Sequence, residues 1–430
     1  MNRTFSLPYG KTSRNFGISE SNCLGSLDLP ELPGVLDVEK AILRALRNPI
    51  RHSPLTEWIR GARKVVVTCP DVTREAQARI YLPVLFGELN RAGISDDQIE
   101  LCFALGTHRE LSHEEMEGIA GASILKRVEF FQSQGNVKED FRLIGSTGKG
   151  TPLWFNTRVL AADRIISTGG VVFHNFAGFG GGRKGLLPGI AQRESVMTNH
   201  RLMLLPQEGA GLNPHCATGI LEKNPIHEDM LDAAMHLSNV FLLNTVLNVR
   251  KEIAGVFAGD LRQAHEAGVA LVRRYFGVPI RQRADFVIFS PGGFPRDISF
   301  YQGFRSLGHA ARAVRPGGVI VLVAEFGEGA GGADKFRHWF ELPDQLSVER
   351  EMRGDFDIVG QVAWDMHQFA KTIRIIAVTA MSEQETRMSL MEPAPSIEEA
   401  LDRVFRLLGP GAKGYVMPQG FFTVPLETQA

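Results

Sequence analysis

The feature that most constrains the fold is a repeated pattern in this sequence. A short β-branched run ends at a glycine, proline or polar turn, and a helical pattern follows. Residues 64–68, 99–104 and 164–168 are such runs, and helical periodicity over 77–92 and 113–119 lies between them. Continuous apolar runs of this length are typical of strands covered by helices on both faces. The pattern predicts βα units around a largely parallel sheet.

The pattern restarts in the second half of the chain. Runs at 285–289 and 318–323 end in glycine-containing turns, and a further run covers 372–378. Because 430 residues exceed what one hydrophobic core usually serves, we predict two Rossmann-like, three-layer α/β domains with an active-site cleft between them. The predicted parts are an N-terminal domain (1–260), a helical connector (261–276), a C-terminal domain (277–405) and a tail (406–430) that can return to the N-terminal domain.

Composition and charge exclude several classes of protein. Lys plus Arg (47) balances Asp plus Glu (48), and no basic stripe marks a nucleic-acid binder. No apolar run approaches the roughly 18 residues that span a bilayer, and the first residues lack the apolar core of a signal peptide. Four cysteines stand far apart without a CxxC pair, which favours reduced thiols. We expect a cytoplasmic protein that acts on a small molecule, without nucleic-acid or membrane partners.

Polar residues follow the predicted strands directly. Asp71 and Arg74 come after the first run, His108 after the second and His174 after the third. Ligands of open parallel sheets bind beyond the carboxyl ends of the strands. We therefore expect these side chains to converge on one cleft, which the turn at 290–293 of the second domain could face.

A glycine-rich stretch at 178–189 contains Arg183 and Lys184. Dense glycine lets backbone N–H groups approach an anion closely, and the two cations add charge. The spacing is neither that of a phosphate-binding GxxxxGK[ST] loop nor that of a GxGxxG dinucleotide fingerprint, which disfavours an ordinary NAD-linked dehydrogenase. A flexible surface turn is one interpretation. The other is a glycine-lined pocket in which partial burial frees the Lys184 amine for covalent attachment.

The histidines suggest acid–base chemistry. Imidazole exchanges protons near pH 7, and His108 and His174 on opposite faces of a substrate would suit a racemase, each serving one enantiomer. His200, on a predicted helix, is a candidate metal ligand whose other donors would come from a cofactor. The remaining candidates, which we interpret as structural, are His215, His227, His265 and His309.

A third group of residues follows the turn at 290–293. A helix there would place Tyr301, Gln302 and Arg305 on neighbouring surfaces, at i,i+4 and i,i+3 spacings. A guanidinium beside an amide and a phenol is suited to bind a carboxylate. The alternative is a solvated helix that carries one cation.

Taken together and in order, these segments resemble the lactate racemase family, which uses a nickel-pincer nucleotide. The resemblance extends from residues 7–11 to about Trp364. The matching pieces are Asp71-Val72-Thr73-Arg74, Leu105 to Arg109, His174 with the glycine loop ending at Lys184, His200, and the Gly293, Asp297, Tyr301-Gln302 stretch.

The resemblance implies a racemase or epimerase that inverts C2 of a 2-hydroxy acid by reversible hydride transfer to this cofactor. Lys184 would carry the cofactor covalently through a thioamide link, and His200 would be the protein's nickel ligand. His108 and His174 would be the acid–base pair. The cofactor and active site would be lined by Asp71, Val72, Thr73 and Arg74, and the substrate would contact Arg74, Tyr301, Gln302, Arg305 and Trp364. The implied partners are the substrate and the proteins that synthesise the cofactor.

Two positions depart from the family pattern. Arg305 stands where many members have lysine, and Glu75 stands where a proline is common. Arginine and lysine are not interchangeable at a carboxylate. The substrate is therefore expected to be lactate or a larger 2-hydroxy acid. The alternatives are a sugar-acid (aldonate) 2-epimerase with the same cofactor and a non-catalytic relative that only binds the cofactor.

Overall fold

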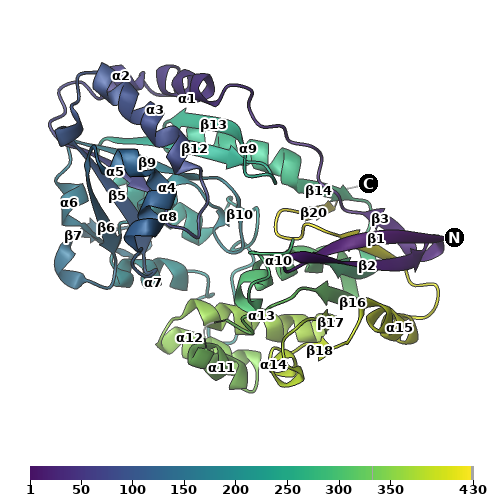
Figure 1. Ribbon diagram of the computed structural model, residues 1–430. Helices are drawn as coiled ribbons and strands as arrows, with labels where there is room; N and C mark the ends of the chain where they lie inside the picture. Colours follow the sequence, from purple (N-terminus) through teal and green to yellow (C-terminus); the bar gives the residue numbers. More distant parts are fainter. Residues whose placement is uncertain (332, 428–430) are drawn as a thin grey trace. The chain divides into compact units, whose positions relative to one another are not determined.

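Strands rich in Val, Ile and Phe form a largely parallel sheet in each of two compact units of the chain (Figure 1). The structure is a computed structural model that describes residues 1–331 and 333–427. Unit 1 comprises Met1–Glu31, Leu204–Gly211 and Tyr275–Ala430, and unit 2 comprises Leu32–Met203 and Leu212–Arg274. Among the residues that the structure describes, no helix has the length and apolar character needed to cross a bilayer.

The main sheet of unit 2 has the strand order β13-β12-β9-β4-β5-β6. All neighbouring pairs are parallel except β12 with β13, which are antiparallel. The strands of this sheet are β4 (Val65–Cys69), β5 (Ile99–Gly106), β6 (Glu129–Gln134), β9 (Arg164–Gly170), β12 (Val240–Leu247) and β13 (Ile253–Gly259). Two short antiparallel pairs are β7 (Phe141–Ser146) with β8 (Pro152–Asn156) and β10 (Phe173–His174) with β11 (Gly178–Phe179).

The helices of unit 2 form layers against this sheet. The core packs Leu46, Leu82 and Phe86 of the helices against Val67 and Leu101 of the strands, all of them fully buried. This buried layer explains the continuous apolar runs in the sequence. The helices are α1 (Val38–Arg47), α2 (Leu55–Trp58), α3 (Ala78–Arg91), α4 (His113–Ala120), α5 (Ala122–Leu125), α6 (Thr157–Leu160), α7 (Arg193–Arg201), α8 (Pro225–Met235), α9 (Gln263–Phe276) and the 3-10 turns η2 (Asp96–Gln98), η3 (Lys138–Asp140) and η4 (Gly182–Gly185).

The main sheet of unit 1 is parallel, in the order β18-β17-β16-β15-β19-β3. Its strands are β3 (Cys23–Ser26), β15 (Ala284–Phe289), β16 (Val314–Val323), β17 (Arg374–Val378), β18 (Glu392–Pro393) and β19 (Gly414–Met417). The other elements are the hairpin β1 (Asn2–Tyr9) and β2 (Thr12–Ser19), η1 (Glu20–Asn22), the pair β14 (Gly277–Ile280) and β20 (Val424–Glu427), and helices α10 (Phe300–Ala311), α11 (Ala333–Glu341), α12 (Gln345–Gly354), α13 (Ile358–Thr372), α14 (Glu383–Met388) and α15 (Ile397–Leu408).

The units divide the chain at points that differ from the predicted domains. Residues 1–31, predicted in the N-terminal domain, belong to unit 1 because β3 pairs with β19 and the hairpin buries Leu7 and Phe16 in the core of this unit. The predicted connector, 261–276, is instead part of unit 2 as far as Arg274. Its His265 bonds to the Gly180 carbonyl of the same unit. The predicted tail, 406–430, belongs to unit 1 because β19 pairs with β15.

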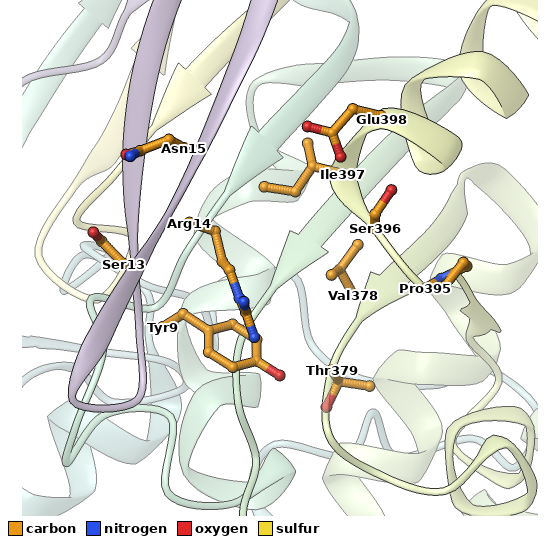
Figure 2. Close-up of a pocket in the computed structure, with 10 residues that line it drawn as sticks. All are labelled: Tyr9, Ser13, Arg14, Asn15, Val378, Thr379, Pro395, Ser396, Ile397 and Glu398. Atoms are coloured by element: carbon orange, nitrogen blue, oxygen red, sulfur yellow. The ribbon is translucent and has the colours of Figure 1, made fainter.

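A cavity of about 470 Å³ opens in unit 1 (Figure 2). The hairpin contributes Tyr9 and Arg14, whose guanidinium stacks over the phenol ring at 4.4 Å. Thr379 follows the end of β17, and Ser396 caps the start of α15. The predicted site residues, all of which the structure describes, are not among those that line this cavity.

Candidate functional site

The predicted polar residues of unit 2 lie at the point where the strand order reverses. The chain leaves β4 toward β5 and β6 on one side, and reaches β9 and β12 on the other. The loops after β4 and β9 therefore flank the position where open α/β sheets bind ligands. These loops touch, because a Cβ atom at Gly170 would lie 2.5 Å from the carbonyl oxygen of Glu75.

The loop after β4 is organised by Asp71, which is 5% exposed. Its Oδ1 accepts hydrogen bonds from the backbone N–H of Thr73 at 2.7 Å and from the Thr73 hydroxyl at 2.6 Å. Arg74 donates to the same hydroxyl at 2.9 Å. Val72 is 40% exposed. The predicted cluster at 71–74 is thus a tight turn that holds one buried carboxylate.

His108 follows β5 and reaches this carboxylate. Its Nδ1 forms a short hydrogen bond with Asp71 Oδ2, and its side chain is 44% exposed. Burial raises the pKa of Asp71, but the hydrogen bond and charge of His108, the charge of Arg74 and the Thr73 bond outweigh it and hold that pKa at about 2. The ionised carboxylate accepts from Nδ1, so Nε2 is the nitrogen that remains to take a substrate proton.

His174 and Lys184 come together at the other loop. His174 lies in β10, opposite Gly178 of β11, and is 5% exposed. Lys184, at the end of the glycine loop, places its Nζ 3.2 Å from His174 Nε2. Phe176 packs its ring 4.5 Å from the His174 ring, and the ammonium of Lys184 lies 5.5 Å from the same phenyl ring. Phe176 was not among the predicted site residues, since a lone phenylalanine carries no signal of a site.

His200 lies in α7, as predicted, and is almost buried. Its ring is 5.0 Å from that of Phe176. Desolvation, with contributions from the charges of Lys184 and His108, lowers the pKa of His200 to about 3. Its Nδ1 is buried and has no hydrogen-bond partner among the described residues. A neutral imidazole with an unused nitrogen is suited to ligate a metal.

Helix α7 is held by a buried carboxylate. Asp229 of α8 is fully buried and accepts from Asn199 Nδ2 at 2.8 Å, one residue before His200. The same carboxylate accepts from the hydroxyls of Thr147 at 2.5 Å and Thr151 at 2.7 Å. These bonds fix the turn of α7 that carries His200.

The glycines of the loop are required by the sheet beneath it. A Cβ atom at Gly182 would lie 2.5 Å from Leu242 Cδ1 in β12. At Gly185 it would lie 2.9 Å from the hydroxyls of Ser167 in β9 and Thr68 in β4. The loop therefore rests directly on the sheet, which contradicts the interpretation as a flexible surface turn.

Arg183, the other cation of the glycine-rich stretch, is fully buried. Its Nη2 donates to the carbonyls of Ala177 at 3.3 Å and Phe179 at 3.1 Å. Its Nη1 donates to the Gly180 carbonyl at 3.2 Å. One guanidinium thus holds the backbone segment between His174 and the glycine loop.

Two histidines interpreted as structural complete the surroundings of Arg183. Its Nε donates to His227 Nδ1 at 3.0 Å, and its Nη1 lies 2.9 Å from His265 Nε2. Desolvation and then the charge of Arg183 lower the pKa of His227 to about 3 and also lower that of His265. Desolvation lowers the pKa of Arg183 itself to about 9, so it remains the charged member at neutral pH.

Four of the five predicted substrate residues lie in unit 1, and the fifth, Arg74, lies in unit 2. Helix α10 carries Tyr301, Gln302 and Arg305, all partly buried, at the predicted helical spacing. The Arg305 guanidinium lies 5.6 Å from the Phe421 ring. Trp364 lies in α13, and its indole Nε1 is buried without a hydrogen-bond partner among the described residues. The acid–base and cofactor candidates are in unit 2 together with Arg74, and the other four substrate candidates are in unit 1.

The donors in unit 2 fit the implied cofactor better than a metal site built from protein alone. In the described part of the chain, no group of three or more His, Cys, Asp or Glu residues could hold a metal ion. His200 offers one neutral, unpaired imidazole, and Lys184 offers an amine beside it. Such a set suits a metal whose other donors belong to a covalently held organic group.

Comparison with known proteins bears on the identity of this site. Residues 9–211 match the lactate racemase N-terminal domain, and residues 280–424 match the lactate racemase C-terminal domain. This chain belongs to the lactate racemase family. The lactate racemase of Thermoanaerobacterium thermosaccharolyticum is 31% identical, over 98% of this chain and 99% of its own. That of Lactiplantibacillus plantarum is 30% identical, over 96% and 97%.

Solved structures place the fold in the same family. The lactate racemase apoprotein of T. thermosaccharolyticum superposes with a TM-score of 0.90 at 30% identity, covering 99% of this chain and 100% of its own. A Thermotoga maritima protein gives a TM-score of 0.65 at 20% identity, covering 91% and 98%, and shows the fold alone. Both matches agree with the predicted pair of α/β domains.

The His227 imidazole predicts a pH dependence of stability. Its pKa in the folded state, about 3, lies below the ordinary value of 6.5, so the unfolded chain binds more protons between these limits. The contribution is therefore fully present above pH 6.5 and is lost as the pH falls toward 3. His227→Asn, whose Oδ1 can still accept from Arg183, should flatten the rise of unfolding free energy with pH by up to about 1.4 kcal/mol per pH unit.

The measurement is urea unfolding between pH 4.5 and 7. His113→Asn is the matched control, because His113 is exposed in an ion pair with Glu117. An unchanged pH slope in His227→Asn would show that His227 does not titrate in this way.

Proposed function

We propose that this protein is a racemase or epimerase that inverts C2 of a 2-hydroxy acid by reversible hydride transfer to a nickel-pincer nucleotide tethered at Lys184. The observation that carries the proposal is the contact of Lys184 Nζ with His174 Nε2 at 3.2 Å, next to a neutral His200. It occurs in a chain that is 31% identical over nearly its full length to a protein named lactate racemase.

The residues of unit 2 have separate tasks in this proposal. Lys184 would hold the cofactor through a thioamide link, and His200 would ligate nickel. Forming that link would replace the ammonium group beside His174 with an uncharged nitrogen. Asp71 orients His108 so that its Nε2 is the basic nitrogen.

His108 and His174 are the proposed acid–base pair. When bound, the nucleotide would supply the acceptor for the hydride of C2. One imidazole would take the hydroxyl proton of the substrate when C2 gives up its hydride, which would leave a 2-keto acid. The other histidine, in its protonated form, would give a proton to the keto oxygen when C2 is reduced from its other face, so each base would serve one enantiomer. The exposure of His108 and the burial of His174 give the two bases different surroundings.

The substrate is proposed to be lactate or a larger 2-hydroxy acid. Arg74, Tyr301, Gln302, Arg305 and Trp364 are the proposed substrate contacts. Arg305, with its planar guanidinium, can bind a carboxylate through two parallel hydrogen bonds, which a lysine cannot. This substitution favours an aldonate 2-epimerase as the second candidate, with the same cofactor residues.

We further propose that the chain works in the cytoplasm alongside proteins that synthesise its cofactor. Its cysteines, Cys23, Cys69, Cys102 and Cys216, carry free thiols. Free thiols persist in reducing compartments.

The proposal predicts the behaviour of two histidine variants. Protein made in cofactor-competent cells is incubated with single-enantiomer 2-hydroxy acids, including lactate and aldonates, and the opposite C2 configuration is measured. His108→Ala and His174→Ala should each lower kcat by about 10²-fold or more, because each removes a general acid–base group, while Lys184 stays modified. His113→Ala, an exposed histidine of α4, is the control. Full turnover in either variant would contradict the paired-base assignment.

Arg305→Lys tests the choice of substrate. If the guanidinium clamps a larger acid, the variant should lower kcat/KM for that acid by about tenfold or more, a loss of one good charged contact, and affect lactate less. The measurement is the ratio of kcat/KM values for the two substrates in parent and variant. A ratio that does not change would remove Arg305 as a determinant of specificity.

A further inference from the structure

Arg183 holds the segment between His174, the proposed acid–base residue, and Lys184, the proposed site of cofactor attachment. Its three carbonyl acceptors, at 177, 179 and 180, lie in the segment that follows His174. His174 itself pairs with Gly178 inside that segment. Lys184 is the next residue after Arg183. The path of the chain from His174 to Lys184 is therefore held by one side chain.

The hydrogen bonds of Arg183 hold the surrounding backbone in a fixed geometry. Its recorded hydrogen bonds go to carbonyls and imidazoles, and among the described residues none goes to a carboxylate. A buried cation without a counter-ion is costly, and apolar residues of similar volume are often at least as stable. A gain in stability therefore does not explain why this charge is buried. The fixed directions of its N–H groups do match the acceptors around it.

His227 contacts the guanidinium of Arg183 at its Nε. Its Nδ1 accepts from Arg183 Nε, and its own helix α8 also contributes Asp229, which anchors Asn199 next to His200. The low pKa of His227 keeps its ring neutral, so Nδ1 remains an acceptor. Helix α8 therefore carries both His227, which contacts the neighbour of Lys184, and Asp229, which anchors the neighbour of His200.

We propose that Arg183, seated on His227, is a positioning residue that sets the Lys184 amine and the His174 imidazole for attachment of the cofactor and for proton transfer. The inference rests on the proposed function for the roles of Lys184 and His174. A lysine at 183 would keep the charge but could not reach acceptors in several directions of one plane. Position 183 therefore requires a planar guanidinium with N–H groups in several directions, and not only a positive charge.

The test combines four variants. Arg183→Lys keeps the charge and removes the planar guanidinium. His227→Leu removes the Nδ1 acceptor, whereas His227→Asn keeps an acceptor at the same place. Ile42→Ala truncates a fully buried side chain of α1 in the same unit and serves as a control for a general loss of stability.

The first readout needs neither cofactor nor turnover. Apoprotein is treated with an amine-reactive reagent, and labelling of Lys184 relative to the exposed Lys126 is followed by peptide mass spectrometry. Release of the loop should change the relative labelling rate of Lys184 by about threefold or more in Arg183→Lys and His227→Leu. His227→Asn and Ile42→Ala should match the parent.

The second readout is made on protein from cofactor-competent cells. Arg183→Lys and His227→Leu should lower kcat by about 10²-fold through misplacement of reacting groups, with little change in KM, and His227→Asn should restore it. Parent-like labelling and kcat in Arg183→Lys, equal loss in both His227 variants, or the same loss in Ile42→Ala would each overturn the proposal. If the parent racemises nothing, the proposed function fails, but the labelling comparison still decides the role of Arg183.

Discussion

The constraint on which the site depends is that the parallel strands β4, β5 and β9 end at one edge of a sheet. The strand order reverses between β4 and β9, so the loops after these strands lie side by side. Asp71 and His174 follow those two strands, and His108 follows β5 next to β4. The glycine loop that carries Lys184 can join them only because Gly182 and Gly185 let its backbone rest on the sheet.

The buried ionisable groups at this edge of the sheet differ in their charge states. Asp71 stays ionised because His108, Arg74 and Thr73 stabilise its charge more than desolvation disfavours it. For His200, desolvation and the charge of Lys184 lower the pKa to about 3, which leaves the imidazole neutral. Arg183 keeps its proton because the ordinary pKa of a guanidinium is so high that desolvation still leaves it near 9. The same environment therefore supplies an oriented histidine, a neutral imidazole and a fixed cation.

Much of this arrangement could be predicted from local sequence. The runs at 99–104, 164–168 and 285–289 lie in strands, as does the run at 64–68 from Val65 onward, and the spacing of Tyr301, Gln302 and Arg305 was correctly assigned to a helix. Periodicity is local, and so these elements were visible. The family was also correctly identified, because an ordered set of short motifs is specific even where each motif is weak.

What escaped prediction depends on contacts between distant segments. Pairing of β3 with β19, which moves residues 1–31 into unit 1, joins positions almost 400 residues apart and leaves no periodic signal. The role of Arg183 was missed for the same reason, since His227 and His265, which contact its guanidinium, come from other helices. A basic residue beside a glycine loop indicates a solvated charge until its neighbours are known.

The central claim is that Lys184 carries a nickel-containing nucleotide. The most direct measurement is peptide mass spectrometry around Lys184, together with nickel analysis, on protein produced in cells that make the cofactor. We expect added mass on Lys184 and nickel equimolar with the modified chain, both absent from Lys184→Ala. Racemase activity in a preparation with unmodified Lys184 and no nickel would contradict the account.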